Sequence, residues 1–511
     1  MEQQHVDVLV IGAGISGISA ASHVLRDNPG ASLVVLERRS RVGGTWDLFR
    51  YPGIRSDSDM PTFGFGFRPW RDARILAGGA EIRQYVEDAA VDHGVLERIR
   101  FRRRATSADF SHATGRWTVE VEDESTGERE SYNAGYVVGA TGYYDYDNPY
   151  RPQFPGEADF QGTLVHPQHW PDDLDHTGKR VVVIGSGATA ITLLPAMADE
   201  AAHVTMLQRS PTYILALPEV DPVTSVLQKL RAPARLTHKI ARTRNIALQR
   251  GSYAFCRKYP RLARKALLGL VRARAGKGVD MRHFSPNYKP WDQRLCVVPG
   301  GDLFKVLKSG KASIATDHID TFTADGIRLK SGEELQADIV ITATGLNVRL
   351  LGGMALTVDG RPVDITNRVL YKAVLLEGVP NMSLVIGYTN ASWTLKADLA
   401  AGYTARLLAH MRRHGHDIAT PMASSSDRSE FSVMGEALTS GYIARANEVM
   451  PRQGTRDPWR LWNNYYRDRA LLQDAPIGDS ALRFDTASNP GSARTSATDA
   501  AADAQEAPRV A

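Results

Sequence analysis

The stretch "VDVLVIGAGISGISAASHVL", residues 6–25, decides the fold of this chain. It begins with the apolar run of a buried parallel strand and ends with the small and apolar residues of a packed helix. Between them, Gly12, Gly14 and Gly17 follow the GxGxxG spacing. Glycines at such a turn let backbone N–H groups approach a pyrophosphate at the positive end of the helix. The stretch therefore predicts a dinucleotide-binding βα unit, with Ser16 in its turn.

An acidic residue follows at the expected distance. The next apolar segment, "SLVVLE", ends at Glu37, twenty residues beyond Gly17. A carboxylate at the end of the second strand can accept hydrogen bonds from the hydroxyls of a ribose. Strand, turn, helix and carboxylate together are much more specific than three glycines alone, and they favour FAD as the ligand of this unit.

A second unit of the same kind begins at "GKRVVVIGSGATAITLLPAMA", residues 178–198. Here Gly185 and Gly187 form the turn, and Ala190 takes the position where helix and strand pack closely. The following strand, "HVTMLQRS", contains Arg209 where the first unit has Glu37. A guanidinium suits the 2′-phosphate of NADPH through charge-assisted hydrogen bonds. The NADPH contacts predicted around this turn also include Ser186, Ala188, Thr189 and Ser210.

Two further apolar segments end in small-residue turns, "YVVGATG" at residues 136–142 and "DIVITATG" at residues 338–345. Such turns are expected where a chain crosses between domains beside a dinucleotide. The second lies well past the NADPH unit, so we predict an α/β protein with two Rossmann-like domains, the NADPH domain being inserted into the FAD domain. The predicted division is 1–150 (FAD domain, first part), 151–221 (linker and NADPH domain, first part), 222–290 (basic helical insertion), 291–340 (NADPH domain, remainder), 341–484 (FAD domain, remainder) and 485–511 (disordered tail).

Length and composition agree with this division. A chain of 511 residues is too long for one core, and 43% hydrophobic with 23% charged residues is typical of globular proteins. No apolar run is long enough for a membrane span, and the first residues lack the basic start of a signal peptide, which favours a cytoplasmic protein. With only Cys256 and Cys296 and no CxxC pair, a disulfide framework, a metal site or a disulfide reductase is not expected.

The region 222–279 has an extreme charge pattern, with fifteen Lys or Arg and no Asp or Glu. Within it, "RLARKALLGLVRARAGKG" (261–278) places leucines near helical spacing. One interpretation is a solvated helical insertion, and the other is peripheral contact with anionic membrane lipid. Nucleic acid is not expected as a partner, because no aromatic stacking platform or known binding module accompanies the charge.

The stretch "FQGTLVHPQHWP", residues 160–171, is typical of neither a helix nor a strand. Its Phe160, Gly162, His166, Trp170 and Pro171 match FxGxxxHxxxWP, the sequence that marks the type I Baeyer-Villiger monooxygenases. The resemblance implies that this stretch is the linker between the FAD and NADPH domains. Gly162 would allow a turn and Trp170 would anchor it. His166 would then have a structural and conformational role more than an acid or base role.

A second pattern of that family is found at "GGTWDLFRYPGIRSD", residues 43–57. The resemblance also covers "RSPTYI", "KPWDQRLC" and "GYTNASWTLKADL", extends over about residues 5–480, and is strongest to the branch with the mycobacterial ethionamide-activating monooxygenase. The family residues carried over to this loop are Gly44, Thr45, Trp46 and Asp57 as contacts of FAD, and Arg55 and Ser56 as contacts of NADPH.

The catalytic arginine of the family corresponds to Arg294 in "WDQRLCVV", and its carboxylate partner to Asp57. The resemblance implies that NADPH reduces FAD and that O2 forms a C4a-peroxyflavin. This species would convert ketones to esters or lactones and oxygenate sulfur in thioethers or thioamides. A fixed guanidinium would favour the peroxyanion, and Asp57 would hold it. Gln293 departs from the Lys common in relatives, which puts a strict preference for NADPH over NADH in doubt.

Two alternatives remain open. A flavin monooxygenase acting on nitrogen or sulfur would not need the pair of Arg294 and Asp57. An NAD(P)H reductase passing electrons to a quinone or a protein, at a membrane through the basic insertion, would give no oxygenated product. The products formed in the presence of a ketone therefore distinguish the three.

Overall fold

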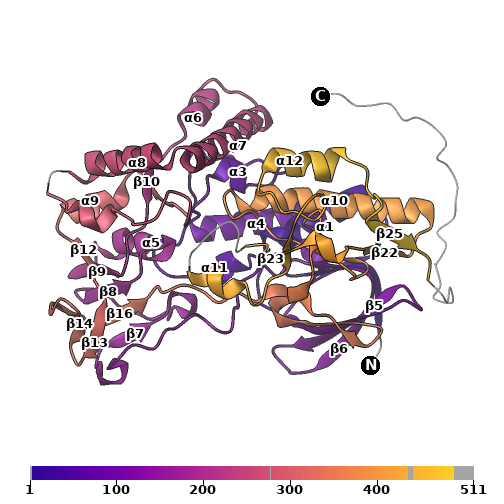
Figure 1. Cartoon of the computed structure of the whole chain (residues 1–511), viewed down its shortest axis with the longest axis horizontal. Helices are drawn as coiled ribbons and strands as arrows, with labels where there is room; N and C mark the ends of the chain where they lie inside the picture. The colour runs from indigo at the N-terminus through magenta and orange to yellow at the C-terminus, as the bar shows by residue number, and fades with distance from the viewer. Residues whose placement is uncertain (1–2, 277, 435–440, 488–511) are drawn as a thin grey trace.

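The computed structural model describes residues 3–276, 278–434 and 441–487. Two sheets lie side by side along the long axis of the molecule, and helices cover them (Figure 1). This arrangement confirms the predicted α/β class with two Rossmann-like units. No helix in the described ranges combines the length and the apolar character that a membrane crossing would need.

The larger sheet has the order β18-β17-β4-β5-β6-β1-β2-β3, and off this path β21 pairs with β6, β20 with β21 and β19 with β20. Its core is parallel, because β1 lies between β2 and β6 with both pairs parallel. The strands are β1 (Gln4–Ile11), β2 (Leu33–Glu37), β3 (Ile99–Phe101), β4 (Arg103–Ser111), β5 (Arg116–Asp123), β6 (Arg129–Gly139), β17 (Ala355–Val358), β18 (Arg361–Pro362), β19 (Leu370–Tyr371), β20 (Leu375–Leu376) and β21 (Met382–Leu384). Residues from both parts of the chain thus build one sheet.

The smaller sheet lies in the intervening sequence and has the order β12-β9-β8-β16-β7, parallel throughout. Its strands are β7 (Thr163–Val165), β8 (Arg180–Ile184), β9 (His203–Gln208), β12 (Ala312–Thr316) and β16 (Ile339–Thr342). The helices α5 (Ala188–Met197) and α9 (Asp302–Lys308) accompany it, as do the small sheet β13 (Ile319–Thr323), β14 (Gly326–Leu329), β15 (Glu334–Gln336) and the pair β10 (Ile214–Leu217), β11 (Cys296–Pro299).

The helices over the larger sheet come from both ends of the chain. Helix α1 (Ile15–Asp27) packs against α10 (Trp393–His414), and both contribute to the core beneath them. α10 ends at Gly415, whose φ of 69° is the left-handed conformation of a helix C-terminus. The other helices here are α2 (Thr45–Leu48), α3 (Met60–Phe63), α4 (Gly79–Asp92), α11 (Gly441–Ala446) and α12 (Tyr465–Arg469).

Three helices form one end of the molecule, at the top of Figure 1. They are α6 (Pro222–Lys229), α7 (Ala234–Lys258) and α8 (Pro260–Ala275). The part of 222–290 rich in Lys and Arg is therefore helical, as its leucine spacing predicts.

The described C-terminal part ends on a strand. β25 (Leu482–Asp485) pairs with β22 (Ile418–Pro421), while β23 (Arg428–Ser432) pairs with β24 (Arg452–Gly454). The Ala487 N–H donates to Asp417 over 3.1 Å. Residues 485–487, assigned to the tail by composition, thus belong to the folded part. The rest of the predicted tail, 488–511, lies outside the described residues.

Candidate active site

A cavity of about 310 Å³ is lined from both halves of the molecule. The first glycine turn and the end of β2 line one side, and the start of α5 lines the other. Arg294, Asp57 and Trp393 also line it, although they lie far apart in the sequence. The first glycine turn and the start of the helix that follows the second turn therefore border one cavity, which contains the candidate catalytic pair.

The first turn requires glycine at two positions. Gly12 has a φ of +106°, and a Cβ there would lie 2.7 Å from the carbonyl oxygen of Ala140. A Cβ on Gly17 would lie 1.8 Å from the carbonyl oxygen of Gly12, so α1 could not pack where it does. Gly14 and Gly44 face each other across the cavity wall, 3.5 Å from a Cβ on Gly14 to the Cα of Gly44. Backbone is thus left accessible where a side chain would fill the space.

Glu37 is buried at the end of β2 and lines the cavity. One carboxylate oxygen accepts the Ala13 N–H over 2.7 Å and the other accepts the Arg39 N–H over 2.8 Å. Burial raises the pKa of Glu37 above its usual value, and these two hydrogen bonds oppose the rise. Nearby, the Arg38 guanidinium donates to both carboxylate oxygens of Asp147 over 3.1 and 2.8 Å, and both residues line the cavity.

The first turn and the loop 43–57 are each held by contacts to other parts of the chain. The Oγ of Ser16 accepts the Trp393 Nε1–H over 2.8 Å. Thr45 Oγ1 lies 3.3 Å from the hydroxyl of Tyr146, whose pKa burial raises to about 12. The ring of Trp46 packs edge-on against Phe63 in α3, with centroids 5.5 Å apart. The Gly43 N–H donates to the Ala13 carbonyl oxygen over 3.1 Å, which places the start of the loop beside the first turn.

The second turn is more open than the first. Gly185 has a φ of +144°, and a Cβ there would lie 2.3 Å from the Ala343 carbonyl oxygen. At Gly187, by contrast, a Cβ would find no heavy atom of the described residues within 4 Å. Ala190 is fully buried.

The side chains of the second turn divide between cavity and surface. Ala188 and Thr189 line the cavity at the start of α5. The hydroxyl of Ser186 donates to the Ser210 carbonyl oxygen over 3.0 Å, which ties the turn to the segment after β9. Arg209 is exposed at the end of that strand, so its guanidinium is available to a ligand that approaches from solvent.

Arg294 and Asp57 meet in the cavity wall, as the resemblance implies. The Nη1 of Arg294 lies 3.4 Å from an Asp57 carboxylate oxygen. Its Nε and Nη2 donate to the carbonyl oxygens of Thr389 and Tyr388 over 3.0 and 3.1 Å. The side chain of Arg294 keeps about a third of its exposure, 34%. The guanidinium is therefore held by main-chain carbonyls and lies beside Asp57, while part of the side chain stays accessible.

The two residues that precede Asp57, Arg55 and Ser56, lie in different environments. Arg55 lines the cavity and pairs with Asp302 of α9 over 2.6 Å. Its buried Nε and Nη2 have no hydrogen-bond partner among the described residues, and such donors fit an anionic ligand. Ser56 is buried and donates to the Ser58 carbonyl oxygen over 2.8 Å. Arg55 thus has donors available for a ligand, whereas the Ser56 hydroxyl is engaged within its own loop.

The stretch 160–171 contains a short strand, contrary to the expectation of an irregular segment. Its centre, Thr163–Val165, forms the strand β7. This strand lies at the edge of the smaller sheet and pairs with β16 on one side only. Phe160 packs against Phe322 with ring centroids 5.9 Å apart. A Cβ on Gly162 would lie 2.5 Å from the Asp338 carbonyl oxygen, so glycine is required. The front half of the stretch thus belongs to the smaller sheet.

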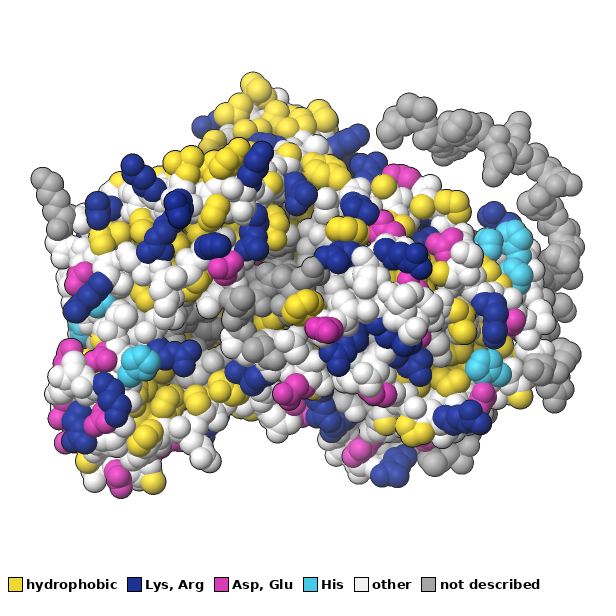
Figure 2. Space-filling view, in the orientation of Figure 1, with side chains coloured by type: hydrophobic (Ala, Val, Ile, Leu, Met, Phe, Trp, Pro, Cys, Tyr) yellow, Lys and Arg dark blue, Asp and Glu magenta, His cyan; other side chains and the backbone are white. Residues whose placement is uncertain are grey.

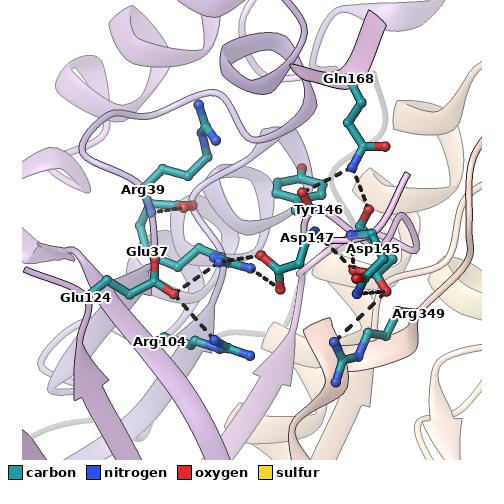
Figure 3. Close-up of polar contacts among 11 residues, drawn as sticks. Glu37, Arg39, Arg104, Glu124, Asp145, Tyr146, Asp147, Gln168 and Arg349 are labelled. Atoms are coloured by element: carbon teal, nitrogen blue, oxygen red, sulfur yellow. Dashed lines mark hydrogen bonds and ion pairs between the residues drawn. The ribbon is translucent and has the colours of Figure 1, made fainter. Parts of the chain in front are cut away.

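The second half of the stretch, residues 166–171, contacts the segment that follows the turn at Gly142. Burial lowers the pKa of His166 to about 4, which leaves the ring neutral near pH 7, and its Nδ1 accepts the Gln168 N–H over 3.2 Å. The Gln168 side chain donates to the carbonyl oxygens of Asp145 and Tyr146 over 2.9 and 3.1 Å (Figure 3). Trp170 packs against the core of the smaller sheet, and Pro171 follows it at a turn whose Leu174 N–H contacts the Pro171 carbonyl oxygen over 3.4 Å.

Comparison with known proteins identifies the class. The pyridine nucleotide-disulphide oxidoreductase family matches residues 6–231. The putative FAD-containing monooxygenase MymA of Mycobacterium tuberculosis is 54% identical over 94% of this chain and 98% of its own length. The probable FAD-binding monooxygenase AlmA of Acinetobacter baylyi is 51% identical (94% and 97%), and the FAD-containing monooxygenase EthA of M. tuberculosis is 49% identical (94% and 98%).

The chain therefore belongs to the FAD-containing monooxygenases. Among solved structures it is similar to a steroid monooxygenase bound to NADP, with a TM-score of 0.76, 22% identity and coverage of 94% of this chain and 100% of the other. An open structure of cyclohexanone monooxygenase gives a TM-score of 0.72 at 19% identity (95% and 100%). These similarities establish the fold. The only two cysteines of the sequence, Cys256 and Cys296, are both free and buried.

Three elements of the site were not found from the sequence. The carbonyl oxygens of residues 388 and 389 hold Arg294, but main-chain groups leave no trace in residue identity. Asp302, the partner of Arg55, lies far from it in the sequence. Gln168 falls at a variable position of FxGxxxHxxxWP, so the pattern gives no reason to single it out.

Proposed function

We propose that this protein is an FAD- and NADPH-dependent monooxygenase that inserts oxygen beside the carbonyl of ketones, forming esters or lactones. Oxygenation of sulfur in thioethers or thioamides at the same site is part of the proposal. The observation that carries it is the pair of Arg294 and Asp57 in the cavity lined by the first glycine turn and by the start of α5. An enzyme that only oxygenates soft nucleophiles or only passes electrons has no need of a fixed cation there.

The residues present fit both cofactors. For FAD, the closely spaced glycines of the first turn and the loop 43–57 leave backbone N–H groups for a pyrophosphate, and buried Glu37 has lone pairs left for a ribose. For NADPH, the unpaired donors of Arg55 and the exposed Arg209 are suited to phosphate groups. Under this proposal FAD is held by the larger unit and NADPH by the smaller one.

When bound, FAD supplies the chemistry that activates O2, and NADPH supplies the hydride that reduces the flavin. The protein's part is electrostatic. Two main-chain carbonyls and Asp57 fix Arg294, so the guanidinium needs little reorganisation to favour negative charge on oxygen at this end of the cavity. The conversion of a ketone depends on this negative charge on oxygen, whereas the oxygenation of a nucleophilic sulfur atom depends on it much less. His166 is neutral near pH 7 and accepts a hydrogen bond within the linker. Its role under this proposal is to maintain the relative positions of the two units.

The decisive variant is Arg294→Ala. It should retain FAD and some NADPH oxidation, because Glu37 and the glycine turns are unchanged. Ester formation from ketones should fall at least about a hundredfold, the usual effect of deleting a positioned electrostatic stabiliser. Thioether oxygenation should fall less, and more of the oxygen consumed should leave as hydrogen peroxide. The measurement is ester, sulfoxide and peroxide formed per NADPH consumed.

A matched control is Arg328→Ala, which removes another exposed Arg–Asp pair, 3.2 Å from Asp320, in a hairpin outside the cavity. It should couple NADPH to ester formation as the parent does. If Arg294→Ala also does so, Arg294 has no part in the reaction. A parent enzyme that oxygenates thioethers but no ketone would support the nitrogen- or sulfur-directed alternative. A parent that gives no oxygenated product at all would support a reductase.

A further inference from the structure

The helices α6, α7 and α8 expose apolar side chains to an extent found nowhere else in the described chain. Sixteen large hydrophobic side chains of the described residues are exposed, and eleven of them lie between positions 220 and 270. Leu230, Leu248 and Leu262 are the most exposed of this group, at 73%, 62% and 57%. In Figure 2 hydrophobic side chains with Lys and Arg among them cover this end of the molecule. We name this surface, formed by the exposed residues of 220–274, the basic apolar face.

These apolar residues are not the ones that attach the helices to the rest of the protein. Helix α7 buries a different set, including Thr237, Ala241 and Asn245. Helix α8 likewise buries Ala263 and Leu267. Since the packing of each helix is provided by its inner side, the outward apolar residues contribute little to the packing of this fold.

Cations line the same outer side in register with the apolar residues. On α7, exposed Leu236 and Ile240 each follow an exposed cation, Arg235 and Lys239. Residues four apart lie on one side of a helix, so cationic and apolar stripes run next to each other. On α8 the same order recurs, with exposed Arg261, Lys265 and Arg272 beside Leu262, Ala266 and Ala273. The pattern of one helix thus repeats on its neighbour.

Some cations of the region are used within the protein, where they pair with acidic residues outside 222–279. Arg242 lies 3.8 Å from Asp398, Arg244 pairs with Asp221, and Arg257 lies 2.8 Å from Asp292. The sequence supplies no Asp or Glu between 222 and 279. The outward cations therefore create a positive potential over an apolar surface.

We propose that the basic apolar face binds the surface of an anionic lipid bilayer. Such a surface matches both properties at once, since lipid phosphates attract the cations and the region below the headgroups accepts leucine and aromatic side chains. A second copy of this chain fits less well, because a two-fold interface would bring the same cations together. Nucleic acid would satisfy the charges and leave the leucines in water.

The proposal is tested by sedimenting the full chain with vesicles. The protein should bind vesicles of phosphatidylcholine mixed with phosphatidylglycerol at least about tenfold more strongly than phosphatidylcholine alone. Binding should fall at least about tenfold between about 0.1 M and about 1 M salt, because the screening length decreases from about 10 Å to about 3 Å. Absence of binding, or equal binding to both vesicles, would overturn the proposal.

Two matched pairs of variants locate the surface. Replacing Leu230, Leu248 and Leu262 by Ser should reduce binding at least about tenfold, whereas replacing Val91, Met422 and Phe431, exposed elsewhere, should change it by less than about twofold. Changing Lys239, Lys258 and Lys265 to Gln should reduce binding by about fivefold per charge. The matched controls for these lysine changes are the same substitutions at three lysines exposed elsewhere, Lys179, Lys311 and Lys330.

If both sets of control variants reduce binding as much as the test variants do, the contact lies elsewhere and the proposal is overturned. Sedimentation velocity without lipid tests the alternative that the face binds a second copy of this chain. If the parent self-associates and the three-leucine variant does not, while vesicles leave both in solution, the face is an interface between copies of the chain. Each variant is first compared with the parent by urea unfolding, and the parent's dependence on lipid charge and salt tests the proposal even if a variant fails to fold.

Discussion

The two glycine turns share a strand-turn-helix pattern but differ in how much room they leave. In the first, Gly17 touches the turn so closely that a single added carbon would overlap Gly12. In the second, Ala190 takes the packing position, and Gly187 faces open space within the described structure. The charged residue at the end of the second strand differs as well. Glu37 is buried and held by two backbone N–H groups, whereas Arg209 is exposed.

This difference corresponds to two ways of binding a dinucleotide. A buried and already ordered site loses little conformational freedom on binding, and its ligand leaves only if the surroundings open. An open turn with an exposed cation allows faster exchange, at the cost of ordering a flexible side chain. Under the proposed function, FAD remains bound over many cycles at the first turn, and NADPH enters and leaves at the second.

The strongest test of this comparison is an added methyl group at each turn. Gly17→Ala should destabilise the fold by about 3 kcal/mol or more, because α1 must move away from the turn. Gly187→Ala should leave stability within about 0.5 kcal/mol, since its φ of −81° suits alanine and its Cβ meets open space. It should instead raise the KM for NADPH, because the methyl group occupies the approach of the ligand. Urea unfolding, FAD content and KM are the measurements.

Equal losses of stability in the two variants would show that the turns are packed alike. Loss of FAD from Gly187→Ala with an unchanged KM for NADPH would reverse the assignment of the cofactors.

A smaller effect is expected at Arg209. Arg209→Ala should raise the KM for NADPH by about tenfold to a hundredfold, the range for losing a hydrogen bond between charged groups. The KM for NADH should change by about twofold or less. Lys179→Ala is the control, as this exposed lysine precedes β8 at the end of the strand away from the turn. A parallel rise for NADH would mean that Arg209 does not recognise the 2′-phosphate.

The smallest effect concerns His166, which joins the two regions. Its pKa is about 4 in the folded protein and near 6.5 when unfolded, so the unfolded chain binds more protons between these values. Stability should therefore fall as the pH drops from 6.5 toward 4. His166→Asn keeps an acceptor for the Gln168 N–H but cannot titrate, and should lose about 1–2 kcal/mol less over that range.

Urea unfolding of both proteins across this pH range gives the difference directly. Identical pH profiles would show that His166 is not held in its neutral form by the fold.

Local sequence was sufficient for the parts of the molecule that neighbouring residues build. The two turns, the strands before them and the helices after them follow from glycine spacing and apolar runs, because these units form from contacts close in the chain. The segments ending at Gly142 and Gly345 indicated that the units alternate along the sequence, and the strands attached to β4 and β6 from residues beyond 350 agree. Arg294 and Asp57 could be paired only through resemblance to a family.

Tertiary structure decided what depends on groups distant in sequence or invisible in residue identity. The sequence determined that this protein has two glycine turns of the dinucleotide-binding type, a cationic helical region and the residues from which the site is proposed. Only the folded chain brings Arg294 to the carbonyl oxygens of Tyr388 and Thr389 and pairs Arg55 with Asp302. It alone determines that one turn is closed and the other open, and that the leucines of α6–α8 face outward. The physical reason is that exposure and orientation depend on which distant surfaces pack together, whereas a turn depends on its own few residues.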